Sequence, residues 1–139
     1  MSPAATGERD GEAVVAYRAM WEDAAEASRT SDPKHPRLDD HAEKNALWLL
    51  QYVMRQARKS GVTMTGEVAV APMVVKESPN RVVLRDCVDG SRWVQVKPGS
   101  APDDMSGGRR HAEATVVRTA KGSWKVSDLY WEDIGTCVK

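Results

Sequence analysis

The stretch RQARKSGVTMTGEVAV, residues 55–70, decides the fold because the spacing of its apolar side chains changes at Gly61. Before this glycine, apolar residues recur every three or four positions, which is typical of an amphipathic helix. After it they stand at even spacing, which is typical of a strand with one buried face; these residues are Val62, Met64, Val68 and Val70. Glycine commonly ends helices. The sequence therefore predicts a helix that ends near Gly61 and a sheet that follows it.

Two amphipathic helices are predicted upstream of this point. The first runs over 11–29 and is ended by a proline-containing loop. The second runs over 38–59, with Asp39 or Asp40 as its N-cap and basic residues in its last turn. The predicted buried stripes are Val14, Tyr17, Trp21, Ala24, Ala25 and Ser28 in the first helix, and Ala46, Leu47, Leu50, Val53, Met54 and Ala57 in the second.

Downstream, the alternating pattern predicts about five antiparallel strands. They are expected over 62–70, 81–88, 91–97, 111–119 and 123–133. A bend or bulge is expected at Pro72, and turns at 77–80 and 120–122. Helices followed by a meandering sheet make an α+β fold. We expect a strongly curved antiparallel sheet that wraps around the N-terminal helices and leaves a conical pocket.

The dipeptide Asp89-Gly90 predicts a two-residue hairpin turn between the strands 81–88 and 91–97. In that hairpin Asp86 faces Trp93, and Cys87 points to the opposite side of the sheet. The Cys87 side carries more apolar residues, so we expect it to be buried and Asp86 to lie at the surface. The alternative is that Asp86 points into the cavity beside Trp93 and serves there as a base.

Composition limits the function classes. The chain has 139 residues, which fits one domain over 11–139 after a disordered lead at 1–10. Lys and Arg number 20, as do Asp and Glu, which argues against nucleic-acid binding, since binders of phosphate backbones carry a basic excess. No apolar run approaches the length of a membrane-spanning helix. The first residues lack a signal-peptide pattern, so the chain is either cytoplasmic or a mature region from which an export signal was removed.

The two cysteines, Cys87 and Cys137, are 50 positions apart and have no ligand-spaced histidines nearby. This spacing argues against a metal site, and a position in the middle of a strand argues against a reactive thiolate. A disulfide is favoured over two buried free thiols, because it would pin the C-terminal tail to the sheet. A disulfide indicates an oxidising compartment.

The remaining polar motifs predict no cofactor and no metal. The histidines, His35, His41 and His111, lack the spacing of metal ligands and are expected at the surface. The GGRR stretch at 107–110 is expected to be a solvated loop, since a phosphate cradle requires glycines that open a helix.

Five stretches together resemble a known family. They resemble a group of small actinomycete domains of secreted or lipoprotein type, which have the nuclear-transport-factor-two-like fold, also called cystatin-like or ketosteroid-isomerase-like. The likeness covers Ala13 to Cys137. The stretches are AYRAMWEDAAEASRTSDPKHPRL at 16–38, GEVAVAP at 66–72, LRDCVDGSRWVQV at 84–96, GGRRHAEATVVR at 107–118 and SWKVSDLYWEDIGTC at 123–137.

This resemblance implies a protein located outside the cytoplasm or at the cell surface, with no assigned activity. Enzymes of the same fold, such as ketosteroid isomerases, dehydratases and polyketide cyclases, use a carboxylate base and a Tyr or His inside the cone. Tyr17 with Asp86 or Asp128 is the nearest imitation here, but the isomerase pattern is not reproduced. The candidate pocket residues are Tyr17, Trp21, Leu47, Leu50, Met54 and Trp93, and the alternative is that most of them are plain core.

Three functions therefore remain open. The favoured one is a non-catalytic accessory domain that binds a small apolar ligand in the cone or a partner protein on the outer sheet face. The second is an enzyme that transfers protons within the cone. The third is a structural interaction module, with a homodimer through the sheet as its simplest form.

Overall fold

The computed structural model describes residues 3–97, 108–132 and 135–137, without the side chains of residues 3–10. Two helices precede six strands within these ranges, so the predicted α+β class is confirmed. The elements are α1 (Pro3–Ser28), α2 (Lys44–Ser60), β1 (Thr63–Gly66), β2 (Met73–Ser78), β3 (Arg81–Asp89), β4 (Trp93–Val96), β5 (Arg109–Arg118) and β6 (Trp124–Trp131). Neither helix has the combination of length and apolar character that crossing a membrane requires.

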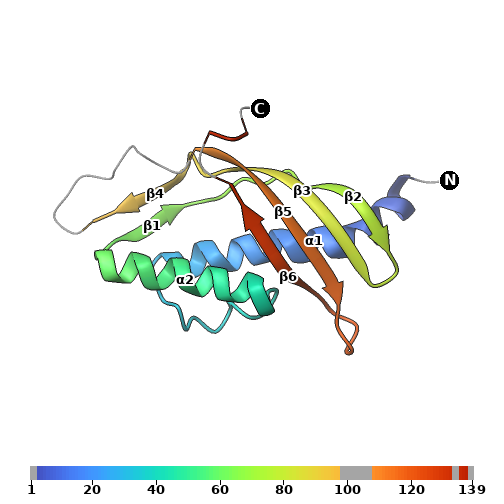
Figure 1. Cartoon of the computed structure of the whole chain (residues 1–139), viewed down its shortest axis with the longest axis horizontal. Helices are drawn as coiled ribbons and strands as arrows, with labels where there is room; N and C mark the ends of the chain where they lie inside the picture. Colours follow the sequence, from blue (N-terminus) through green and yellow to red (C-terminus); the bar gives the residue numbers. More distant parts are fainter. Residues whose placement is uncertain (1–2, 98–107, 133–134, 138–139) are drawn as a thin grey trace.

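The strands form two antiparallel sheets. The larger has the order β2-β3-β5-β6, and the smaller pairs β1 with β4. Helix α1 crosses the concave face of the larger sheet, and α2 lies alongside β6 (Figure 1). The core fills the space between these layers. Its largest fully buried apolar side chains are Tyr17, Met20, Leu38, Leu50, Met54, Leu84, Val116 and Val126.

Helix α2 ends where the sequence predicts and begins later. Gly61 adopts the left-handed conformation (φ 71°), and its N–H and that of Val62 donate to Arg58 and Ala57, closing the helix. The N-cap is Glu43, so the predicted caps Asp39 and Asp40 were wrong. The reason is tertiary, because the backbone at 41–43 bonds to β6 through Val126 before the helix starts.

Helix α1 begins at Pro3, eight residues before the predicted start at Gly11, and ends at Ser28. Residues 3–10 of the predicted disordered lead at 1–10 therefore belong to its first turns, and residues 1–2 lie outside the described residues. The extension of one domain over 11–139 stays a prediction.

The predicted hairpin between β3 and β4 was wrong. The chain does turn after Gly90, but β4 leaves the larger sheet and pairs with β1. Both edges of β3 are already occupied, one by β2 and the other by β5, which pairs along the full length of β3. Asp86 therefore stands opposite Ala112 and not opposite Trp93. An Asp-Gly dipeptide indicates a turn, but it does not determine which strand occupies the neighbouring edge.

The buried side of β3 is the opposite of the one that the sequence predicted. Asp86 and Cys87 do point to opposite sides of β3, but the buried side is the one with Leu84, Asp86 and Val88. Asp86 is only 4% exposed, so the expectation of a surface position was wrong. The physical reason is that Tyr17 on α1 provides a polar partner for this carboxylate inside the core.

A β-bulge in β6 changes the predicted location of Asp128. Thr115 pairs with Asp128 whereas Val116 pairs with Val126, so Ser127 is an extra residue in the strand. A bulge reverses the side to which the following residues point. Val126 is buried, while Asp128 and Tyr130 are exposed. Asp128 therefore lies outside the cone.

Gly66 ends β1 in a conformation that requires glycine, and we predict that Gly66→Ala lowers the free energy of unfolding by about 2 kcal/mol. Its φ is 99°, and a Cβ at this position would lie 1.9 Å from the backbone carbonyl oxygen of Arg92. Urea unfolding measures this loss of stability.

Gly122→Ala is the matched control. Gly122 also has a positive φ, 91°, but a Cβ there meets nothing within 4 Å. We expect a loss of about 1 kcal/mol from backbone strain alone. Equal losses in the two variants would contradict the steric explanation for Gly66.

Candidate ligand pocket

The described residues form a mainly apolar pocket of about 440 Å³ between α2 and the smaller sheet. Three tryptophans from three different elements meet in its wall: Trp21 of α1, Trp93 of β4 and Trp131 of β6. The ring centroid of Trp21 is 6.2 Å from that of Trp93, in an edge-to-face contact, and 5.6 Å from that of Trp131. Such clusters present large apolar surfaces in a fixed geometry. The C-terminal half of α2 closes the opposite side with Met54 and Ala57.

The wall also contains neutral polar side chains, which are Ser28, Tyr52, Gln56, Ser60 and Gln95. The indole N–H of Trp93 donates to the hydroxyl of Ser28 at 3.0 Å. The indole nitrogen of Trp21 is buried and has no hydrogen-bond partner among the described atoms. Arg110 is the one charged residue among the described residues of the wall, and its guanidinium lies 5.7 Å from the Trp131 ring centroid. An occupant would therefore meet aromatic surface, several neutral polar side chains and the guanidinium of Arg110.

The structure divides the predicted pocket residues into two groups. Trp21, Met54 and Trp93 line the pocket. Tyr17 and Leu50 lie in the core, and Leu47 packs against the core, so these three do not form the described wall. The assignment of these residues to ligand binding stays a prediction.

Most residues of the wall were not predicted from the sequence, and Trp131 and Arg110 are the two that matter most for its chemistry. Trp131 follows the bulge in β6, which could not be located from the alternation of side chains. Arg110 falls in the GGRR stretch, for which a solvated loop was expected, but it belongs to β5. The only sequence signal for either residue is its type, because aromatic and arginine side chains often occur at binding surfaces.

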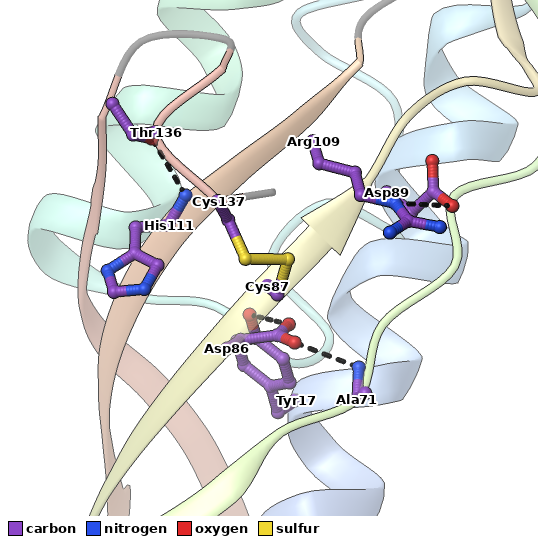
Figure 2. Close-up of a disulfide and its surroundings, with 9 residues drawn as sticks. All are labelled: Tyr17, Ala71, Asp86, Cys87, Asp89, Arg109, His111, Thr136 and Cys137. Atoms are coloured by element: carbon purple, nitrogen blue, oxygen red, sulfur yellow. Dashed lines mark hydrogen bonds and ion pairs between the residues drawn. A yellow bond between two sulfur atoms is a disulfide. The ribbon is translucent and has the colours of Figure 1, made fainter. Parts of the chain in front are cut away.

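Tyr17 and Asp86 meet in the core beside the pocket. The Tyr17 hydroxyl donates to Asp86 Oδ2 at 2.6 Å, and the backbone N–H of Ala71 donates to Oδ1 at 2.8 Å (Figure 2). Both carboxylate oxygens therefore have a donor, as a buried carboxylate requires. Tyr17 and Asp86 are not among the residues that line the pocket.

The environment of Tyr17 favours its neutral form. Burial raises the pKa of Tyr17 well above its ordinary value of 10.0, and the negative charge of Asp86 and the hydrogen bond to it raise the pKa further. A phenol with this pKa holds its proton at neutral pH. Trp21, whose ring makes an edge-to-face contact with that of Tyr17 at 6.4 Å, lines the pocket, whereas Tyr17 does not.

Cys87 and Cys137 form the predicted disulfide, with their Cα atoms 5.8 Å apart. The bond lies on the side of β3 opposite Asp86 (Figure 2). Two further contacts hold the tail, one from the N–H of His111 to the Thr136 hydroxyl and one from the N–H of Gly135 to the carbonyl of Arg109. The disulfide therefore fixes the tail on the outer face and contributes nothing to the pocket wall.

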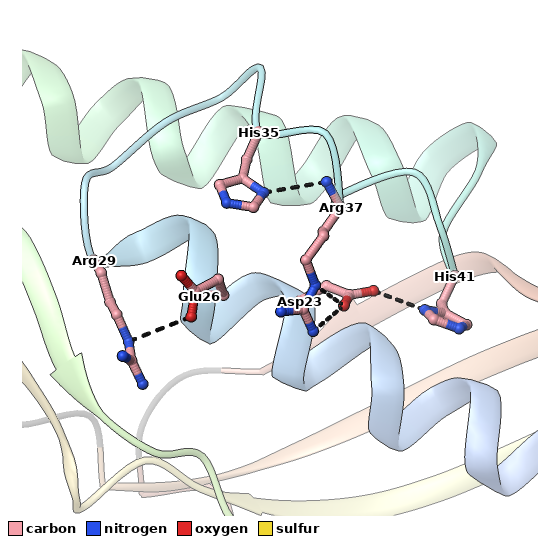
Figure 3. Close-up of polar contacts among 6 residues, drawn as sticks. All are labelled: Asp23, Glu26, Arg29, His35, Arg37 and His41. Carbon is pink, nitrogen blue, oxygen red and sulfur yellow. Dashed lines mark hydrogen bonds and ion pairs between the residues drawn. The ribbon is translucent and has the colours of Figure 1, made fainter.

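A second buried carboxylate, Asp23, organises the loop between the helices. It is 2% exposed, and it binds Arg37 Nη2 at 2.8 Å and His41 Nδ1 at 2.7 Å (Figure 3). The sequence pattern did not predict this cluster, because Asp23 lies outside the apolar stripe of α1. His41 was expected at the surface and is half-buried. The cluster closes the loop over α1, which explains why α2 starts late.

Of the other two histidines, His111 is exposed, as expected, whereas His35 is half-buried. The Nδ1 of His35 accepts from the backbone N–H of Arg37 within the loop, and His111 lies on β5. Within the described ranges, no three His, Cys, Asp or Glu residues come close enough together to hold a metal ion.

Comparison with solved structures identifies the fold. The intermembrane space region of the chloroplast protein ARC6 matches with a TM-score of 0.53 and 10% identity, over 96% of this chain and 98% of that one. A ketosteroid isomerase-like protein from Erwinia carotovora atroseptica matches with a TM-score of 0.59 and 14% identity, over 90% and 95%. The chain therefore has the ketosteroid-isomerase-like, or nuclear-transport-factor-two-like, fold.

No family model matches the chain, and no curated protein is significantly similar to it. At these identities the structural likeness establishes the fold and not an activity, since this fold hosts unrelated functions.

Proposed function

We propose that the protein is a non-catalytic binding domain that holds a small apolar ligand between α2 and the smaller sheet. The observation that carries this proposal is the cavity of about 440 Å³ with three tryptophans in its wall. Cavities of this size that are lined by aromatic side chains and a few polar groups are typical of small-molecule sites. Contacts with Trp21, Trp93 and Trp131 would supply most of the binding energy.

Arg110 refines the chemistry of this ligand. Its guanidinium contributes a positive charge to a wall that is otherwise neutral in the described residues. Arginine is suited to planar carboxylates, which it binds through two parallel hydrogen bonds. The proposed ligand is accordingly an aromatic or aliphatic body that carries one acidic group.

Proton transfer in the cone is the alternative function, and the geometry supports it less. That reaction requires a carboxylate and a phenol that both reach the bound substrate. Tyr17 and Asp86 do contact each other, as this alternative requires, but they are not among the residues that line the pocket. Asp128 is on the exposed side of β6. A binding function does not require these three residues, because it depends on the residues that line the pocket.

Localisation outside the cytoplasm is part of the same proposal. Its support is the disulfide between Cys87 and Cys137, since disulfides persist in oxidising compartments. The resemblance to actinomycete domains of secreted or lipoprotein type points the same way. A partner protein on the outer face of the sheet, and a homodimer through it, stay predictions.

Titration with naphthalene-2-carboxylate tests the pocket, with naphthalene-2-methanol as the uncharged match. We expect the carboxylate to quench tryptophan emission and to raise the melting temperature. Trp93→Leu should weaken its binding at least about tenfold, since the loss of aromatic contact is worth about 1.4 kcal/mol or more. Arg110→Gln should abolish the preference for the carboxylate and leave the binding of naphthalene-2-methanol unchanged.

The matched control is Trp124→Leu. Trp124 is partly buried, and its indole donates to Glu12 at 3.1 Å outside the pocket wall. This variant should bind the carboxylate as the wild type does. The proposal fails if neither compound binds, or if Trp93→Leu and Trp124→Leu weaken binding equally.

A further inference from the structure

Helix α2 carries an exposed stripe of basic and aromatic side chains. The helix repeat of 3.6 residues places positions spaced by three or four residues on one side. Five residues with the spacing 4, 4, 3 and 4 fall on the side opposite the buried Ala46, Leu50 and Met54, and all five are exposed. These five, here called the α2 stripe, are Lys44, Trp48, Tyr52, Arg55 and Lys59.

The charge of this helix departs from the neutral balance of the whole chain. The sequence of α2, KNALWLLQYVMRQARKS, contains four basic residues and no acidic one. Three of the basic residues, Lys44, Arg55 and Lys59, belong to the stripe, and Arg58 lies at its margin. In the described part of the chain, each ion pair is formed by residues outside α2. The stripe therefore presents uncompensated positive charge to the solvent.

Two large aromatic rings lie at the centre of this charge. Trp48 is 54% exposed and Tyr52 is 41% exposed, although both are large apolar residues. Their rings stack with a centroid distance of 5.2 Å and an interplanar angle of 13°. The contact holds both rings in one orientation on the surface. Exposed aromatics of this kind mark an interaction surface more often than a single exposed side chain does.

We propose that the α2 stripe docks on the surface of a lipid bilayer that contains anionic lipid. Trp and Tyr side chains prefer the headgroup level of a membrane, where the apolar ring and its polar tip are both accommodated. Lys and Arg beside them are attracted to anionic headgroups, so a protein surface that combines the two suits a bilayer with anionic lipid. In Figure 1, α2 runs along one side of the molecule as an outer element, so a planar surface can approach it.

The location of the pocket adds a consequence. Tyr52 belongs to the α2 stripe and also lines the pocket. Other residues of the same helix that line the pocket are Val53, Gln56, Ala57 and Ser60. A bilayer bound at α2 would therefore present its amphiphiles beside the proposed ligand pocket. This second step rests on the proposed function, whereas docking at the membrane does not.

Vesicle co-sedimentation tests the docking. The wild-type protein should sediment with vesicles of phosphatidylcholine and phosphatidylglycerol, and not with phosphatidylcholine alone. Each basic residue near an anionic surface strengthens partitioning by roughly fivefold. We therefore expect Arg55→Gln/Lys59→Gln to weaken binding at least about tenfold. The charge-matched control is Arg81→Gln/Lys121→Gln, which alters two exposed basic residues outside α2 and should bind as the wild type does.

Quenching by lipids with brominated acyl chains locates the contact. Trp48→Phe keeps an aromatic ring and all charges, so it should retain vesicle binding but lose most of the quenching. Circular dichroism confirms that each variant is folded. The proposal is overturned if vesicles with and without phosphatidylglycerol bind equally, if the two double variants lose binding equally, or if quenching persists in Trp48→Phe. Absence of vesicle binding with retention on an acidic protein or on nucleic acid would overturn it as well.

Discussion

Replacing Cys87 and Cys137 together with serine is expected to lower the free energy of unfolding by about 4 kcal/mol. The two residues are 50 positions apart, so the bond closes a long loop and removes much of the entropy of the unfolded chain. In the native state, the C-terminal tail loses its covalent attachment to β3. Two hydrogen bonds at Gly135 and Thr136 still hold the tail, but less firmly than the disulfide does. For a domain of this size, the loss corresponds to a fall in melting temperature of about 10–15 °C.

Urea unfolding with and without dithiothreitol measures this effect. The reductant should destabilise the wild type by the same amount as the double substitution and should leave the variant unchanged. A single substitution, Cys137→Ser, removes the bond but keeps the partly buried sulfur of Cys87. It should be as unstable as the double variant. A loss below about 1 kcal/mol would show that the unfolded chain is already restricted without the bond.

The helices and the turns were predictable because their signals are local. The helix stop at Gly61 follows from the αL conformation that glycine adopts readily, and it appears where the sequence places it. The turns predicted at 77–80 and 120–122 are observed at 79–80 and 119–123. The start of α2 was not predictable, because it depends on a pairing with Val126, more than eighty residues away. Sequence spacing contains no information about that contact.

Strand pairing failed for the same reason. Asp89-Gly90 correctly predicted a change of direction, but the partner of β4 is decided by which edge is free. The disulfide was predictable because it needed only two cysteines and a spacing that argues against a metal site. Which side of β3 is buried was not predictable from apolar counts, since the buried side contains a carboxylate whose partner, Tyr17, comes from a distant helix.

The sequence predicted that aromatic and apolar residues would line a pocket, but it identified only some of them. Trp21, Met54 and Trp93 were named as candidates and line it, while Trp131 and Arg110 enter through a bulge and a strand extension. Alternation of side chains along β6 holds only as far as Ser127, where one extra residue reverses the pattern. The same shift removed Asp128 from consideration as a residue inside the cone.

Tyr17→Phe is expected to lower the free energy of unfolding by about 3 kcal/mol at neutral pH. The substitution leaves the shape of the side chain nearly unchanged but removes the hydroxyl that donates to Asp86 Oδ2 at 2.6 Å. Asp86 then keeps only the N–H of Ala71 inside the core. Tyr130→Phe is the control, because Tyr130 is 64% exposed and should change stability by less than about 0.5 kcal/mol.

The double variant Tyr17→Phe/Asp86→Leu distinguishes an unpaired charge from simple loss of a contact. With both polar groups removed, no buried carboxylate remains unsatisfied, so this variant should lose less stability than the sum of the single losses. Additive losses would indicate that the two side chains act independently, in contradiction to the hydrogen bond between them.

The dependence on pH provides a test that packing alone cannot reproduce. Burial first, and then the charge of Asp86, raise the pKa of Tyr17 above its ordinary value of 10.0 in the native state only. Above pH 10 the unfolded chain therefore releases a proton that the native state keeps. The contribution of Tyr17 to stability is intact below that pH and is lost as the pH rises toward the folded pKa. Tyr17→Phe has no such proton, so its deficit relative to the wild type should narrow by about 1.4 kcal/mol per pH unit above pH 10. Urea unfolding from about pH 8 to about pH 11 measures the difference in the free energy of unfolding between the wild type and Tyr17→Phe. A difference that stays constant over this range would mean that Tyr17 ionises in the native state as it does in water.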